Sequence, residues 1–306
     1  MKYSELPYER IDVEKRRNLM KEYLEKFSNA ESFNEQANVI LDVNKQNKEY
    51  HSYAAMASLN FSRNIYDEDA KAEKDYYDSI GPDMIEIGDL FEKAVVQSKY
   101  KDELSKKWGE KFLIDIETSL KTFDPKIKEM LKEETDLRNE YTKLTAGAKI
   151  TYEDKEYNLA GLGPFHSNED RNVRKASIEA RFHWFSENSE ALDDIYDKLV
   201  KLRHKIATTL GYDNFIELGY MRMGRSDYGP NEVANFRKQI VDHVVPVVKK
   251  LVVKKKDILG LDHLYFYDGI NFKEGDPKPK GSPDHLIKEA QVMYRELSQE
   301  TGDFFD

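Results

Sequence analysis

The feature that most constrains this chain is the helical period of its apolar residues. Apolar residues that recur every three or four positions share one face of an α-helix. The segment 189–210 shows this period most clearly, with a stripe made of Leu192, Ile195, Tyr196, Leu199, Leu202, Ile206 and Leu210. On the other side Asp194 stands four residues before Lys198, and Asp197 before Lys201, a spacing that suits ion pairs on a solvated helix surface. Because this period recurs along most of the chain, we expect an all-α protein.

Turn and cap residues divide the pattern into separate helices. Gly81-Pro82 predicts a break, because proline inside a helix loses a hydrogen bond and clashes with the preceding turn. Pro125 follows Asp124, which fits the first position of a helix after an aspartate cap. In the first half the predicted helices are therefore 12–27, 31–61, 67–79, 83–97, 101–122 and 125–146.

A change of period follows at 148–165. Ile150 and Tyr152 alternate with polar residues, as do Tyr157 and Leu159, which predicts one small β-hairpin near 148–160. Helices are expected to resume at Ser167, since Ser167 and Asp170 have the spacing of a capping box. The expected fold class is therefore an all-α, multi-helix, bundle-like protein with this one hairpin.

The stretch KIATTLGYDNFIELGYMRMGRSDYGP, residues 205–230, is expected to join three helices. Gly211 is the expected left-handed residue after a helix, and Asp213 the expected cap of a short helix that ends at Met223. Asp227 is expected to cap a long helix over 231–259, which we expect to bend at Pro246. The following LDHLYFYDG is expected to be a short extended piece, and a last helix starts near Pro283.

Aromatic, methionine and arginine side chains are concentrated in this stretch. Such side chains can wedge one helix against several others, so we interpret the stretch as a packed corner. The alternative is a wall of a substrate cleft. The candidate substrate-binding residues are then Tyr220, Arg222, Arg225 and Tyr228.

Composition excludes several classes of function. The formal net charge of -10 argues against a general nucleic-acid binder, which needs a cationic face. The absence of cysteine excludes disulfides and thiolate metal sites, so a metal would need His, Asp and Glu. No H-E-x-x-H occurs, and the pairs Glu179–His183 and His285–Glu289 are expected to be solvated or capping.

The N-terminal sequence MKYSELPYERIDVEKRR has no apolar region of the kind found in signal peptides. Apolar runs such as VVPVV at 244–248 are too short to span a bilayer. We therefore expect a cytoplasmic protein with neither nucleic-acid nor membrane partners.

Long segments of the chain closely resemble oligoendopeptidase F, a zinc metallopeptidase of the thimet-oligopeptidase family. The resemblance rests on IYDKLVKLRHKIATTLGYDNFIELGYMRMGRSDY at 195–228, VANFRKQIVDHVVP at 233–246 and LGPFHSNEDRNVRKAS at 162–177. It implies the N-terminal lobe of a bowl-shaped, mostly helical enzyme that hydrolyses short oligopeptides. In the family, an H-E-x-x-H helix and a later glutamate provide the zinc ligands and the catalytic glutamate.

None of those motif positions occurs in this sequence, so no catalytic or metal residue can be assigned. We expect an N-terminal fragment that ends before the zinc site and is inactive alone, with zinc only in the full-length enzyme. The expected regions are 1–147, antiparallel helices; 148–188, a β excursion and linking helix; and 189–306, the helical start of the peptidase domain.

Two other hypotheses stay open. One is a catalytically dead helical module that binds peptides or serves as a scaffold. The other is a new metal site made from scattered His and Glu residues. For the fragment, we expect apolar surface where the missing part would dock, and self-association through that surface.

Overall fold

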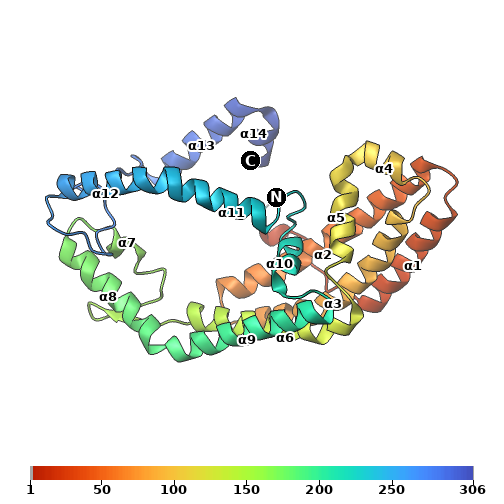
Figure 1. The fold of residues 1–306 in the computed structure, drawn as a ribbon, viewed down its shortest axis with the longest axis horizontal. Helices are drawn as coiled ribbons and strands as arrows, with labels where there is room; N and C mark the ends of the chain where they lie inside the picture. Colours follow the sequence, from red (N-terminus) through yellow and green to blue (C-terminus); the bar gives the residue numbers. More distant parts are fainter. Residues whose placement is uncertain (1–2, 306) are drawn as a thin grey trace. The chain divides into compact units, whose positions relative to one another are not determined.

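The computed structural model describes residues 3–305, which form two compact units. Unit 1 comprises the chain up to Leu159 together with His183–Val244, and unit 2 comprises Ala160–Phe182 together with the chain from Val245 onward. Both units are built almost entirely from helices (Figure 1), which confirms the predicted all-α class. The three predicted regions concern domain organisation, and their boundaries stay a prediction.

Three helices form the main core of unit 1. They are α1 (Val13–Asn29), α2 (Phe33–Arg63) and α3 (Glu68–Val96), and each packs against the other two (Figure 1). Each begins at an acidic or hydroxyl cap: the side chains of Asp12, Ser32 and Asp67 accept hydrogen bonds from backbone N–H groups of the first turn. The most deeply buried residues of this core are Phe27, Ala37, Ala57, Ile87, Val95 and Leu104.

The predicted break at Gly81-Pro82 is wrong, because α3 is one continuous helix with Pro82 buried inside it. Proline in a helix interior costs about 3 kcal/mol. The helix also buries six large apolar side chains, each of which contributes roughly 1.5–3 kcal/mol. They are Tyr77, Ile80, Met84, Ile87, Phe91 and Val95. This packing outweighs the local preference of proline.

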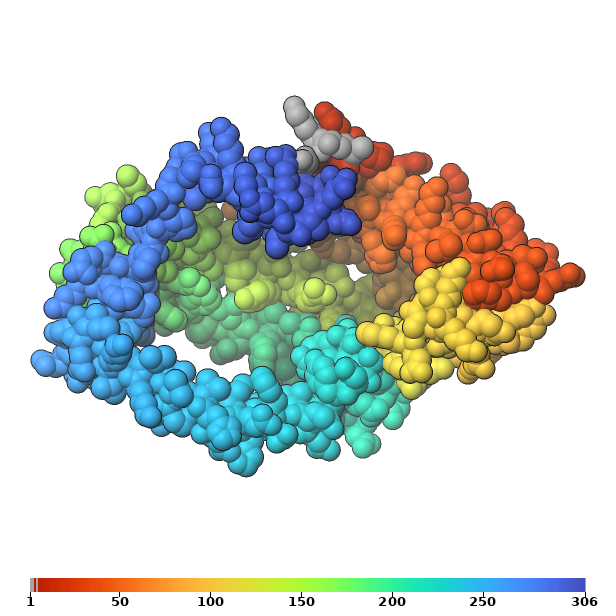
Figure 2. Space-filling model, turned by 90° about the horizontal axis from the view of Figure 1, so that it is seen from above, coloured from red at the N-terminus to blue at the C-terminus, as the bar shows by residue number. Residues whose placement is uncertain are grey.

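The helix predicted over 101–122 is divided in two. It consists of α4 (Lys101–Trp108) and α5 (Glu110–Leu120), with Gly109 between them at a φ of +88°. Such a positive φ cannot continue a helix and is adopted readily by glycine. The break lets α4 pack on α2 while α5 packs on α3, and Figure 2 shows this yellow segment against the orange and red helices.

The next segments follow the prediction more closely. The 3₁₀ turn η2 (Pro125–Ile127) leads into α6 (Lys128–Ala146), and Asp124 accepts a hydrogen bond from the N–H of Lys126. The strands β1 (Ile150–Tyr152) and β2 (Lys155–Tyr157) form the predicted antiparallel hairpin, with Ile150 opposite Tyr157.

The joint after α9 (Ser189–Thr209) has the geometry expected at Gly211. Gly211 has a φ of +94°; its N–H donates to Thr208 O, and the N–H of Tyr212 donates to Ala207 O at 3.0 Å. These two bonds form a Schellman motif. The cap of α10 (Phe215–Arg222) is Asn214 rather than Asp213, because Asn214 has the extended backbone that lets its side chain accept from Ile216 N–H.

The long helix predicted over 231–259 contains an irregular segment. It consists of α11 (Pro230–Gln239), the π-helical η3 (Ile240–Val244) and α12 (Val245–Leu259). Pro246 has no N–H to donate, and the wider π turn lies directly before it. Asp227 does not cap α11; instead Glu232 accepts a hydrogen bond from Gly229 N–H, since Pro230 already occupies the first helical position.

Unit 2 contains α7 (Gly163–His166), the first part of α8 (Arg171–Glu187), α12, α13 (Pro283–Leu297) and α14 (Gln299–Phe305).

The capping box predicted at Ser167 is wrong. Ser167 follows α7, and the side chain of Asp170 accepts a hydrogen bond from Asn172 N–H at the start of α8. The predicted extended piece at 261–269 is a series of bends and turns. Ser282 caps α13 near the predicted start. Within residues 3–305, no helix is both long and apolar enough to cross a membrane.

Candidate functional site

A buried carboxylate holds the joint of unit 1 together. Glu134, on α6, has a side chain that is only 4% exposed. It accepts from Arg203 Nε at 2.7 Å and from Arg222 Nη2 at 2.8 Å. Burial alone would raise the pKa of Glu134, but the two guanidinium groups outweigh it and hold the pKa below its ordinary value. Both guanidinium groups also lie over the ring of Phe215, so α6, α9 and α10 are fastened at one point.

This arrangement places Arg222, a predicted substrate-binding residue, in the packed corner. Its side chain is 28% exposed, and its charge is paired with Glu134. Nearby, the hydroxyl of Tyr212 donates to Lys121 O, which ties the corner to the end of α5. The geometry therefore supports the packed-corner interpretation for this part of the stretch.

The other three candidates lie together on the surface. The guanidinium carbon of Arg225 is 4.9 Å from the ring centroid of Tyr220 and 5.7 Å from that of Tyr228. Beside them is a shallow pocket of about 450 Å³ that Val233 and Phe236 also line. A cation between two aromatic rings next to an apolar depression can bind peptide backbone and apolar side chains.

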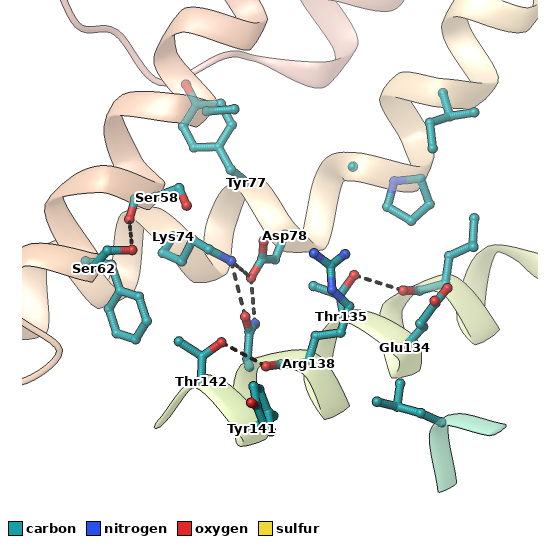
Figure 3. Close-up of a pocket in the computed structure, with 18 of the residues that line it drawn as sticks. Ser58, Ser62, Lys74, Tyr77, Asp78, Glu134, Thr135, Arg138, Tyr141 and Thr142 are labelled. Carbon is teal, nitrogen blue, oxygen red and sulfur yellow. Dashed lines mark hydrogen bonds and ion pairs between the residues drawn. The ribbon is translucent and has the colours of Figure 1, made fainter. Parts of the chain in front are cut away.

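A larger pocket of about 720 Å³ lies in unit 1 between α2, α3 and α6 (Figure 3). On its floor Lys74 pairs with Asp78, and Asn139 Nδ2 donates to Asp78 Oδ2 at 2.7 Å, which connects α3 to α6. No sequence pattern predicts this pocket. Its lining residues come from five helices, α2, α3, α6, α9 and α10, so no local spacing reveals it.

Unit 2 has its own buried ion pair. Asp268 has a side chain with no exposed surface and accepts from Arg171 Nε at 2.8 Å and from the N–H of Tyr265 at 2.8 Å. Arg174, also buried, donates to Tyr267 O. The Arg171 guanidinium lowers the pKa of Asp268 to about 2 despite its burial. This network fastens the segment after α12 to α8.

No group of three or more His, Asp or Glu side chains among residues 3–305 is arranged to hold a metal ion. His183 contacts Glu187 at 3.2 Å, while Glu179 contacts Lys175. His285 Nδ1 is 3.9 Å from Glu289. Each of these two histidines therefore contacts a single carboxylate, and the described side chains do not fit the three-ligand zinc site of a catalytic centre.

Comparison with known families gives two matches along the chain. Residues 3–123 match the Peptidase M3 N-terminal domain, and residues 165–286 match Peptidase family M3. No curated protein matches the sequence.

Solved structures share the whole fold. Pz peptidase A, solved with an inhibitor, is 40% identical with a TM-score of 0.94, over 99% of this chain and 54% of that one. A protein assigned as oligoendopeptidase F from Bacillus anthracis strain Ames is 36% identical with a TM-score of 0.93, over 99% of this chain and 56% of that one. The chain thus spans a little over half the length of these structures. The two family matches and the shared fold show that this chain is an oligoendopeptidase F-like member of peptidase family M3.

Proposed function

We propose that this chain is the N-terminal, peptide-binding part of a zinc metalloendopeptidase that hydrolyses short oligopeptides inside the cell. The observation that carries the proposal is the similarity to Pz peptidase A and to oligoendopeptidase F over nearly all of this chain. The 306 residues contain no H-E-x-x-H motif, and the described ones contain no metal-binding group. The role left to this chain is therefore to bind and orient peptides.

In such an enzyme, zinc would polarise the substrate carbonyl and activate a water molecule. The residues of this chain would act before that step, on the substrate. Arg225, between Tyr220 and Tyr228, presents a cation and two aromatic edges beside an apolar depression. Peptide carbonyls accept hydrogen bonds from guanidinium groups, and apolar side chains pack on aromatic rings.

A cleavage assay tests the division of roles. The purified chain is incubated with a quenched fluorescent peptide, with added zinc or with a chelator. We expect no chelator-sensitive cleavage in either case, because no activated water can form without a ligand set. Zinc-dependent cleavage by the purified chain would contradict the proposal.

Peptide binding tests the candidate residues. Arg225→Ala should weaken the binding of a short peptide severalfold, with an unchanged circular dichroism spectrum. Lys106→Gln, on the exposed surface of α4, is the matched loss of one positive charge. If Arg225→Ala binds as tightly as the parent chain, Arg225 acts only in the corner.

A catalytically dead peptide-binding or scaffold module is the alternative, which the missing metal ligands favour. Such a module would bind peptides but never support their cleavage, even when a polypeptide carrying the H-E-x-x-H motif is added.

We also propose self-association through apolar side chains of α12, since Val247, Leu251 and Val253 are each more than half exposed. Sedimentation velocity over a range of concentrations tests this, and a monomer throughout would exclude it.

A further inference from the structure

The pocket between α2, α3 and α6 contains an uneven set of charges. Three cationic and two carboxylate side chains line it: Lys74, Arg138, Arg222, Asp78 and Glu134. The carboxylates are already engaged, since Asp78 pairs with Lys74 and Glu134 pairs with Arg222. The pocket therefore keeps one positive charge that no carboxylate of its lining neutralises.

That charge belongs to Arg138. Arg138 lies on α6, and its side chain extends toward α3 at the pocket (Figure 3). Among residues 3–305, its guanidinium makes no ion pair and no hydrogen bond; only its backbone carbonyl is used, by Thr142. A guanidinium has five N–H donors in a planar fork, and a carboxylate matches two of them at once.

A second donor is available in the same pocket. Tyr50 lines it from α2, with its ring 6.1 Å from that of Tyr77, and its hydroxyl makes no hydrogen bond within the described part of the chain. Tyr77 and Phe61 supply aromatic walls that are almost fully buried. The pocket thus combines a free guanidinium, a free phenol and apolar rings, in a volume of about 720 Å³ that suits a small ligand.

We propose that this pocket binds a peptide carboxylate, with Arg138 as the charged partner and Tyr50 as a hydrogen-bond donor. A single surplus positive charge matches a monoanion better than a dianionic phosphate, because Asp78 and Glu134 would repel the second negative charge. The choice of a peptide over another carboxylate rests on the function proposed above. The surplus charge and the free donors are structural observations that do not depend on that proposed function.

Calorimetric titration of the purified chain tests the proposal. The probes are N-acetyl-Ala-Ala-Phe as the free acid, the same peptide as its C-terminal amide, and N-acetyl-Ala-Glu-Ala amide, which carries its carboxylate on a side chain. We expect the free acid to bind about tenfold more tightly than the amide, because one charge-assisted hydrogen bond contributes about that much to affinity. The glutamate peptide should bind like the free acid if any carboxylate suffices, and like the amide if the pocket selects the chain terminus.

Arg138→Gln should abolish the preference for the free acid, and Tyr50→Phe should reduce it about threefold. Arg138 is exposed, and its side chain makes no hydrogen bond or ion pair among residues 3–305, so we expect Arg138→Gln to fold like the parent chain. Lys106→Gln is the charge-matched control and should leave the preference unchanged.

Equal binding of acid and amide, or an acid preference that survives Arg138→Gln, would overturn the proposal. If peptides then still bind and depend on Arg225, only the carboxylate pocket fails and the proposed function stands. If none of the peptides binds, the pocket proposal fails together with the peptide-binding role.

Discussion

Asp89 is a buried carboxylate whose ionisation should weaken the fold near neutral pH. It lies on α3 and is 5% exposed, and among residues 3–305 its nearest cation is Lys93, whose Nζ is 3.8 Å from Asp89 Oδ2. Burial raises the pKa of Asp89 to about 6, and the positive charge of Lys93 opposes this rise only in part. Glu92, one helical turn further along α3, also has a raised pKa, because burial disfavours its charged form as well. The two carboxylates therefore also repel each other when both are ionised.

The magnitude follows from the shift. The folded pKa of Asp89 lies about 2 units above the ordinary value of 3.8, and one unit corresponds to about 1.4 kcal/mol. At pH 7.5 ionised Asp89 therefore costs about 3 kcal/mol of stability. Because the folded pKa is the higher one, this cost shrinks as the pH falls below about 6 and vanishes below about 4.

Asp89→Asn removes the charge and keeps the shape. We expect it to raise the free energy of unfolding by up to about 3 kcal/mol at pH 7.5, and by only about 1 kcal/mol at pH 4.5. Urea unfolding followed by circular dichroism at both pH values measures the difference. Asp42→Asn, on the exposed face of α2, is the control and should change little at either pH. An equal gain at both values, or no gain at pH 7.5, would refute the reasoning.

Three further substitutions test the remaining contacts. Glu134→Gln should cost about 3 kcal/mol in urea unfolding, because it leaves Arg203 and Arg222 without a buried anion; a loss below 1 kcal/mol would show that the pair contributes little. Asp268→Asn should lower the thermal midpoint at pH 7, and the difference from the parent should narrow as the pH falls from about 4 toward 2, where the low-pKa carboxylate itself loses its charge. Gly211→Ala should lower the free energy of unfolding by about 1 kcal/mol, because the φ of +94° disfavours a Cβ. An unchanged thermal midpoint would mean that α9 can end without a residue in the left-handed conformation.

Helix existence was predictable from local patterns, while several boundaries were not. The stripe at 189–210, the caps at Asp124 and Gly211 and the hairpin near 148–160 all rest on neighbouring residues, and the structure confirms them. The failures share one cause: packing energy outweighs local preference. Pro82 stays inside α3 for this reason, and no local signal predicts how much apolar surface the two flanking segments bury together.

The candidate site shows the same limit. Glu133 and Glu134 are adjacent, and their types alone do not distinguish them. The helical period puts Glu134 three residues from Leu131 and from Leu137, on the packed side of α6, and this was the available signal. What the period cannot supply is the pair of arginines, since Arg203 and Arg222 come from other helices.

The sequence by itself determined the all-α class, the single hairpin, and the membership in a peptidase family through long matching segments. It also established that no H-E-x-x-H motif is present in these 306 residues. Only the tertiary structure decided which charges are neutralised and which stay free. Arg222 and Arg138 look alike in sequence, yet one is paired with a buried carboxylate and the other faces an open pocket. The reason is that the ion pair of Arg222 joins helices far apart in the chain, and only packing brings those helices together.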